Sequence, residues 1–214
     1  MVAGGSGSRF GGPKQFLQLA GRSVVAWSVA AAHGVADGVV LVVPSSESNV
    51  ATPFDVADAG ADRVVTGGTS RAASVRAGLA AVPADADVVV IHDAARPLAQ
   101  GWLFAAVIDA LDIEGVDGAI PVLAVSDTLK RVSDGTVQAT VDRDGLVTVQ
   151  TPQAFAAATL RAAHAGESDA TDDAGLLEAL GATVRIVPGD PRNLKLTCPE
   201  DLAIAEALMG TATR

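Results

Sequence analysis

Residues 88–93 read Val-Val-Val-Ile-His-Asp, so four apolar residues are followed directly by two polar ones. Residues 39–43 form a second run that is apolar at every position. Strands buried on both faces have this pattern, and they occur in parallel sheets that are covered by helices. We therefore expect two buried strands, the second of which ends at His92 and Asp93.

Longer segments with helical spacing separate the short apolar runs. Within residues 72–82, for example, the apolar side chains recur on one helix face. An alternation of strands and helices predicts an α/β fold with a doubly wound, mostly parallel sheet. The expected strands are 39–43, 63–65, 88–91, 118–122 and 183–187, and the expected helices are 23–33, 70–82, 102–111, 152–165, 171–180 and 199–209.

Residues 123–149 interrupt this alternation. Two segments with little apolar content flank the turn signal Ser133-Asp134-Gly135, which predicts a β-hairpin. An isolated hairpin is only marginally stable in water, so we expect it to pack on the main body or on a second subunit. The chain is thus interpreted as a single domain, 1–214, with a protruding β-arm at 123–149.

The composition excludes several classes of protein. The 214 residues are 49% hydrophobic, which fits one globular domain with a sizeable core. The net charge of -10 argues against general binding to nucleic acids or anionic membranes. A single cysteine excludes a disulfide framework and a cysteine-based zinc site. The sequence shows no signal peptide and no membrane-spanning run, so we expect a cytoplasmic protein.

A glycine-rich segment at residues 3–14 reads Ala-Gly-Gly-Ser-Gly-Ser-Arg-Phe-Gly-Gly-Pro-Lys. Glycines let backbone amides approach an anion closely, and Arg9 and Lys14 add positive charge. Phe10 occupies the third glycine position of the dinucleotide fingerprint, and Pro13 occupies the lysine position of the triphosphatase loop. The segment is therefore interpreted as another kind of anion loop, with a flexible terminus as the alternative.

Three further features are candidates for a ligand site. Gly67-Gly68-Thr69-Ser70 leads from a strand into a helix, either as a ligand contact or as an ordinary capped turn. Asp93 follows a buried strand, where it either holds Mg²⁺ or caps a turn. His92 is interpreted as a structural hydrogen-bonding residue. Arg143 and Lys195 stand in polar turns, where residue type alone indicates surface charges.

These motifs together resemble the 2-C-methyl-D-erythritol 4-phosphate cytidylyltransferase family. The resemblance covers nearly the whole chain in the right order, and the combination of His-Asp-Ala-Ala-Arg-Pro with Thr-Pro-Gln is its most specific part. The matching segments are residues 3–10 and 13–15, Gly67-Gly68 with Arg71 and Ser74-Val75, 92–97, 127–128, 141–143, 151–153, 171–173, 193–195 and 199–201.

The resemblance implies transfer of a cytidylyl group from CTP to 2-C-methyl-D-erythritol 4-phosphate, with release of diphosphate, in the non-mevalonate isoprenoid pathway. It implies Mg²⁺ as cofactor. The residues agree with such chemistry, because the attacking phosphate oxygen is already anionic near neutral pH and needs no general base. Catalysis of this type consists mainly of positioning and electrostatic stabilisation.

The resemblance also implies a role for each matching residue. Arg9 and Lys14 would stabilise the transition state, and Asp93 would hold Mg²⁺. Arg143 and Lys195 would grip the sugar phosphate, and the arm would cross to a partner subunit in a homodimer, so that its residues serve the neighbour's site. The implied nucleotide contacts are Ala3, Gly4, Gly5, Gly7, Gly68, Thr69, Ser74 and Asp93, and the implied substrate contacts are Thr128, Arg143, Thr151, Thr171 and Lys195.

Two departures from the family pattern accompany the resemblance. Only Met1 and Val2 precede the loop, so we expect a shortened central strand or a start further upstream. Fewer residues than usual separate Arg9 from Lys14, so the loop is expected to close differently over the phosphates. Two other functions stay open: a related enzyme with another acceptor, such as ribitol 5-phosphate, and a nucleotide-binding protein without turnover.

Overall fold

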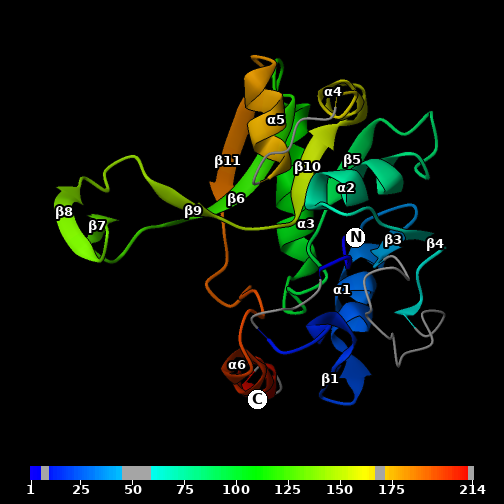
Figure 1. Cartoon of the computed structure of the whole chain (residues 1–214). Coiled ribbons are helices and arrows are strands. Elements are labelled where there is room, and N and C mark those ends of the chain that lie inside the picture. The colour runs from blue at the N-terminus through cyan, green and yellow to red at the C-terminus, as the bar shows by residue number, and fades with distance from the viewer. Residues whose placement is uncertain (6–9, 45–58, 167–171, 212–214) are drawn as a thin grey trace.

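The computed structural model describes residues 1–5, 10–44, 59–166 and 172–211 (Figure 1). Its helices are α1 (Val24–His33), α2 (Arg71–Leu79), α3 (Gly101–Asp109), α4 (Ala157–Ala163), α5 (Asp173–Ala179) and α6 (Glu200–Thr211), with short 3₁₀ turns η1 (Lys14–Phe16) and η4 (Ala110–Asp112). Its strands are β1 (Gln18–Leu19), β2 (Arg22–Ser23), β3 (Val40–Val43), β4 (Arg63–Thr66), β5 (Val88–Ile91), β6 (Gly118–Ala124), β7 (Leu129–Ser133), β8 (Thr136–Val141), β9 (Val147–Val149), β10 (Gln153–Ala156) and β11 (Val184–Pro188).

The central sheet confirms the α/β class, and it is mixed. Its strands follow the order β11-β6-β10-β5, with β9 also paired to β6. Strand β11 runs parallel to β6, whereas β10 runs antiparallel to both of its neighbours. The sequence analysis was wrong about residues 153–156, which were expected to begin a helix. A short apolar run is ambiguous in periodicity, and burial of Phe155 between β5 and β6 makes this one a strand.

Residues Met1–Ala3 join the parallel pair β3–β4 to β5. The amide of Val2 donates to the carbonyl of His92 at 2.8 Å, and the amide of Ala3 donates to the carbonyl of Val42 at 2.8 Å. Val2 forms isolated bridges to Val42 of β3 and to Asp93 just beyond β5, so the pairing at this point of the sheet is short. Beside it lies a cavity of about 690 Å³, lined largely by apolar side chains of α1, α2, α3, β3 and β5.

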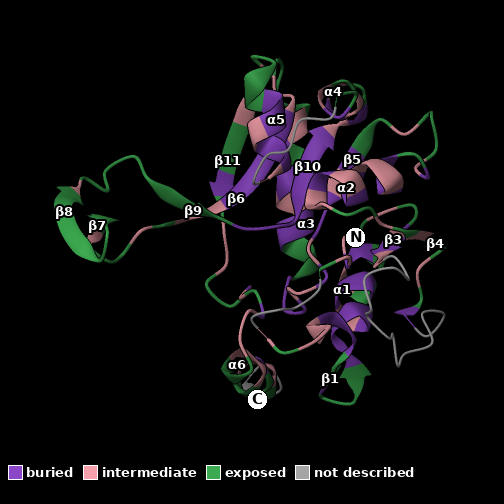
Figure 2. Ribbon diagram, in the orientation of Figure 1, coloured by how far each residue is buried: buried purple, intermediate pink, exposed green. Residues whose placement is uncertain are grey.

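Two main apolar clusters hold the helices to the sheet. One contains residues of α1 and α3, such as Val29 and Phe104, packed around Leu41 of β3. The other contains residues of α2, α4 and α5, such as Leu160, packed around Phe155 of β10. Figure 2 shows these strands and the helix faces against them as buried. The core therefore lies around the strands whose ends carry the candidate site.

The arm confirms the expected hairpin. Strands β7 and β8 pair only with each other in the described part of the chain, and they lie apart from the body in Figure 1. Asp134 and Gly135 both have positive φ, 48° and 74°, as the central residues of a tight type I′ hairpin turn do. Val132 and Val137 are 63% and 58% exposed, so the arm buries little apolar surface within its own chain.

Gly118 offers a test of how tightly the core is packed. A Cβ at this position would lie 2.7 Å from Cδ1 of Phe155, whose side chain is fully buried. We expect Gly118→Ala to lower the free energy of unfolding by about 1–3 kcal/mol, because overpacking forces the ring off its site. Gly101→Ala is the control, since nothing lies within 4 Å of the added atom. Urea denaturation would measure both, and equal stability of the two variants would contradict the packing described.

Candidate active site

The first wall of the site is the loop at Ala3–Gly5. The side chain of Gln15, which is 3% exposed, donates through Nε2 to the carbonyl of Ala3 at 2.6 Å and to that of Gly5 at 3.0 Å. A buried amide with two carbonyl partners fixes the direction of this loop. Sequence reasoning passed over Gln15 as a site residue, because a neutral residue beside Lys14 carries no signal of burial.

The second wall is the turn before α2. Ser70 caps this helix through a 3.1 Å hydrogen bond from the amide of Ala73 to its side chain. Ser74 lies one turn further on, and its hydroxyl donates to the carbonyl of Ser70 at 3.0 Å. A Cβ on Gly4 would lie 3.1 Å from Oγ of Ser74, and one on Gly67 would lie 2.6 Å from it. The two glycine segments therefore meet at Ser74.

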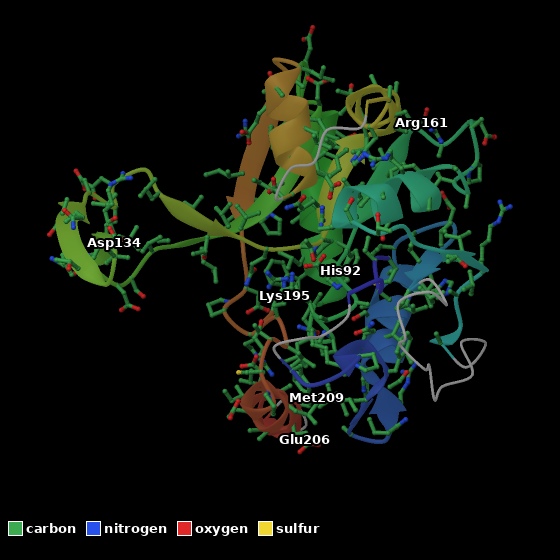
Figure 3. The ribbon with its side chains drawn as sticks, viewed as in Figure 1. His92, Asp134, Arg161, Lys195, Glu206 and Met209 are labelled. Atoms are coloured by element: carbon green, nitrogen blue, oxygen red, sulfur yellow. The ribbon has the colours of Figure 1, made fainter. Side chains whose placement is uncertain are left out.

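Asp93 stands beyond the end of β5 between two cations. Its Oδ2 accepts a hydrogen bond from Nζ of Lys195 at 2.6 Å, and its Oδ1 lies 3.9 Å from Nη2 of Arg71. Burial alone would raise the pKa of Asp93, but the charges of Lys195 and Arg71 outweigh burial and lower that pKa. The carboxylate is therefore ionised at neutral pH. In Figure 3 the labelled side chains of Lys195 and His92 lie near the centre of the molecule.

A buried polar network holds Asp93 and Lys195 in place. The amide of Asp93 donates to Oγ1 of Thr151 at 3.0 Å, and Oγ1 lies 3.1 Å from Nδ1 of His92. Nε2 of His92 lies 3.2 Å from the carbonyl of Arg96. A neutral imidazole with its proton on Nε2 satisfies both contacts, because it donates to Arg96 and accepts from the Thr151 hydroxyl. Desolvation lowers the pKa of His92 to about 3, in agreement with this state.

The same network extends to the C-terminal segment. The guanidinium of Arg96 donates to the carbonyl of Asn193 at 2.7 Å, and Nδ2 of Asn193 donates to the carbonyl of Thr151 at 2.9 Å. Asn193 is fully buried. Since Lys195 follows Asn193 by two residues, these bonds set where the lysine ammonium meets Asp93.

The structure brings together most of the residues expected at the site. Thr151 is buried, and its hydroxyl accepts a hydrogen bond from the amide of Asp93. Lys14 lies in η1, and its charge acts on the carboxyl of Asp201. Desolvation alone would raise the pKa of Asp201, but hydrogen bonds from two backbone amides, together with the charge of Lys14, lower that pKa. Thr151 and Lys195 contact Asp93 directly, whereas Gly4 and Gly68 contact Ser74, and Ala3 and Gly5 are held by Gln15. Thr69 stands between Gly68 and the capping residue Ser70.

Other expected site residues lie elsewhere. Thr128 and Arg143 belong to the arm segment, and Arg143 donates to the carbonyl of Ser126 within it. Gly7, Arg9 and Thr171 lie outside the described residues.

Two residues behind the site were assigned no role from the sequence, although Asp173 belongs to the matching segment 171–173. Asp173 is 1% exposed and lies 2.7 Å from Arg71, and His164 lies 3.0 Å from Asp173. Arg71 entered the sequence analysis only through the family resemblance. The sequence shows an acidic residue at position 173, but it cannot show that this residue pairs with Arg71, about a hundred positions earlier, because that contact depends on the tertiary fold.

The donor set of the site suits one kind of metal ion. No group of three or more His, Cys, Asp or Glu side chains forms a metal site within the described ranges. Oδ1 of Asp93 is an ionised carboxylate oxygen that no cation approaches closer than 3.9 Å among the described residues, and it fits Mg²⁺, which keeps several waters and binds through one or two carboxylates plus substrate phosphates. Asp93 has these properties, and the surrounding backbone and cations suit a polyphosphate.

A sequence profile described as "IspD: 2-C-methyl-D-erythritol 4-phosphate cytidylyltransferase" matches residues 1–211 of the chain. The chain belongs to this cytidylyltransferase family. A cytidylyltransferase of that name from Deinococcus radiodurans is 45% identical, with 97% of this chain and 87% of that protein covered. The bifunctional enzyme IspD/IspF of Clavibacter michiganensis is 44% identical, with 98% of this chain and 53% of that protein covered.

Solved structures of the cytidylyltransferase family have the same fold. The enzyme from Thermus thermophilus superimposes with a TM-score of 0.82 at 36% identity, covering 98% of this chain and 96% of that one. The chain spans about half the length of the bifunctional relative and most of the length of the single-function relatives. None of the helices in the described segments is long and apolar enough to cross a membrane.

The neutral state of His92 predicts a pH dependence of stability. Its pKa is about 3 in the folded protein and about 6.5 in the unfolded chain, so the unfolded chain binds the extra proton between these values. Stability therefore falls as pH falls through this window, and at pH 5.5 His92 alone costs about 1.4 kcal/mol relative to pH 7.5.

Urea denaturation at both pH values, on the wild type and on His92→Gln, would isolate this effect. The amino group of Met1, whose pKa burial lowers to about 6, titrates equally in both proteins. We expect the pH-dependent loss to be smaller by about 1.4 kcal/mol in the variant. Equal losses in the two proteins would show that His92 is not buried in its neutral form.

Proposed function

We propose that this protein catalyses the transfer of a cytidylyl group from CTP to 2-C-methyl-D-erythritol 4-phosphate. A phosphate oxygen of the acceptor attacks the α-phosphorus of CTP and forms a new P–O bond, while the bond from that phosphorus to the bridging oxygen breaks and diphosphate leaves. The observation that carries the proposal is the meeting of Lys195, Asp93 and Arg71 beyond the end of β5. Arg71 begins α2, the helix whose Ser74 contacts Gly4 and the Gly67-Gly68 turn. Membership of the cytidylyltransferase family supports the choice of substrates.

The charge arrangement supports this chemistry. Both reactants are polyanions, so the enzyme has to reduce their repulsion and align them. Lys195 is half exposed and can reach a bound phosphate while it stays close to Asp93. Arg9 and Lys14 belong to the glycine-rich segment 3–14 and are proposed to contact the triphosphate. The backbone around Ala3 and Gly68, with Ser74 beneath it, is proposed to hold the nucleoside.

Mg²⁺ is the proposed cofactor, with Asp93 as its protein ligand. When bound, this ion supplies positive charge to the phosphates of CTP. The protein's own contribution is to keep Asp93 ionised and fixed through its amide bond to Thr151. The reaction needs only solutes of the cytoplasm, which we propose as its location.

We also propose that the protein works as a homodimer joined by its arm. Val132, Val137 and Leu146 are exposed apolar side chains in the segment 123–149, and burial against a second copy would remove them from water. Strands β7 and β8 lie apart from the body of their own chain (Figure 1), so Arg143 is proposed to serve the partner's site.

Removal of either lysine tests the catalytic proposal. We expect Lys14→Ala and Lys195→Ala each to lower kcat by about 10²–10³-fold, as the loss of a preorganised charge commonly does. Diphosphate release with CTP, Mg²⁺ and the methylerythritol phosphate is the measurement, and ribitol 5-phosphate serves as competing acceptor. Arg185→Ala removes an exposed cation of β11 and is the control. Normal turnover in both lysine variants would contradict the roles assigned here.

Mixing two inactive variants tests the dimer. A mixed dimer of Arg143→Ala and Lys195→Ala subunits has one site with both cations intact, if Arg143 acts in the neighbour's site. Random subunit exchange should then restore about one quarter of the wild-type activity. Activity that stays at the level of the separate variants, with exchange verified by native mass spectrometry, would show that Arg143 does not act across subunits.

A further inference from the structure

Behind Asp93 a row of charged side chains continues into the protein. Arg71, the first residue of α2, lies between two carboxylates that come from different elements. Its Nη2 is 2.7 Å from Oδ2 of Asp173 and 3.9 Å from Oδ1 of Asp93. Arg71 therefore forms a close ion pair with Asp173, the inner carboxylate, and lies further from Asp93, the carboxylate of the site.

The inner carboxylate is held firmly. Asp173 and His164 both have side chains exposed by 2% or less, and Nε2 of His164 donates to Oδ1 of Asp173 at 3.0 Å. A carboxylate with one oxygen bound to an imidazole cannot turn freely, so its other oxygen keeps a fixed position. The backbone of α5 does not depend on this contact, because Asp172 caps the helix by accepting from the amide of Gly175.

The buried carboxylate is also the main partner of the arginine's charge. Burial by itself would lower the pKa of Arg71, but the charge and hydrogen bond of Asp173, followed by the charge of Asp93, raise it. Arg71 thus stays a cation that must have a carboxylate partner. Of the two within reach, Asp173 takes the closer position.

We propose that Asp173, oriented by His164, is a positioning residue that holds Arg71 back from Oδ1 of Asp93, the oxygen that Lys195 does not bind, and so keeps this oxygen available to a divalent cation. The inference rests on the proposed function, in which Asp93 is the metal ligand. If the charge of Asp173 is lost, Arg71 keeps only Asp93 as a carboxylate partner within 4 Å among the described residues. A close ion pair between Arg71 and Oδ1 of Asp93 would compete with the divalent cation for this oxygen atom.

The test measures divalent-ion binding without turnover. Mn²⁺, a spectroscopic substitute for Mg²⁺, is titrated into the full-length protein with CTP and no acceptor, and free Mn²⁺ is followed by electron paramagnetic resonance. We expect Asp173→Asn to weaken Mn²⁺ binding by about 10-fold or more, a typical loss when a partner behind a metal ligand is removed. In the full assay the half-saturating Mg²⁺ concentration should rise, while kcat at saturating Mg²⁺ stays within about two-fold.

A double variant separates positioning from a general structural effect. Asp173→Asn combined with Arg71→Gln removes the arginine that would otherwise move to Asp93, so Mn²⁺ affinity should return towards the wild-type value. Loss of packing around Asp173 would not be repaired by a second substitution. Glu178→Gln is the matched control, because it removes an exposed carboxylate of the same helix that does not act on Arg71, and its Mn²⁺ affinity should be unchanged.

Each outcome decides the matter. Wild-type Mn²⁺ affinity in a folded Asp173→Asn protein overturns the inference, and so does a double variant as weak as the single one. If Asp173→Asn does not fold, His164→Leu removes only the donor to Asp173 and should weaken Mn²⁺ binding in the same direction, whereas unchanged binding overturns the inference. A wild type that binds Mn²⁺ and CTP but never releases diphosphate would refute the proposed function instead.

Discussion

The contact between Lys195 and Asp93 connects parts of the chain that are 102 residues apart. Asp93 is fixed by the sheet through β5, and Lys195 belongs to the irregular segment that leads to α6. The ammonium and carboxylate lie 2.6 Å apart, and the carboxylate is mostly buried. A pair in this setting is stable only if both partners are oriented by further hydrogen bonds, because desolvation opposes it. Much of the polar structure around the site supplies that orientation.

The supporting bonds run through neutral groups. His92, Thr151 and Asn193 are buried, uncharged and connected to one another directly or through the backbone. Neutral partners orient the charged ones without adding to the desolvation cost. The charged pair Lys195–Asp93 therefore lies at the front of the site, and mainly neutral hydrogen-bonding groups lie behind it. The charged exceptions are Arg96, which donates to the carbonyl of Asn193, and the ion pair of Arg71 with Asp173.

The sequence predicted the parts of this structure that depend on local pattern. Runs such as residues 39–43 and 88–91 indicated buried strands, the turn at Asp134-Gly135 indicated the hairpin, and the glycine segments indicated a ligand-facing backbone. The antiparallel strand β10 was missed, because four residues fit a strand and a helix equally well until their neighbours are known. Gln15, His164 and Asp173 were missed for a related reason: their roles arise from contacts between distant segments. The placement of Arg9 and Thr171 stays a prediction.

The short central strand has a mechanical consequence. The pair β3–β4 is joined to the rest of the sheet by the backbone bonds of Met1–Ala3, and the glycine loop begins at the next residue. A ligand that binds this loop therefore contacts residues next to the connection between the β3–β4 pair and the rest of the sheet. Because the loop and these backbone bonds share adjacent residues, a ligand that binds the loop and the pairing of the two halves of the sheet should stabilise each other.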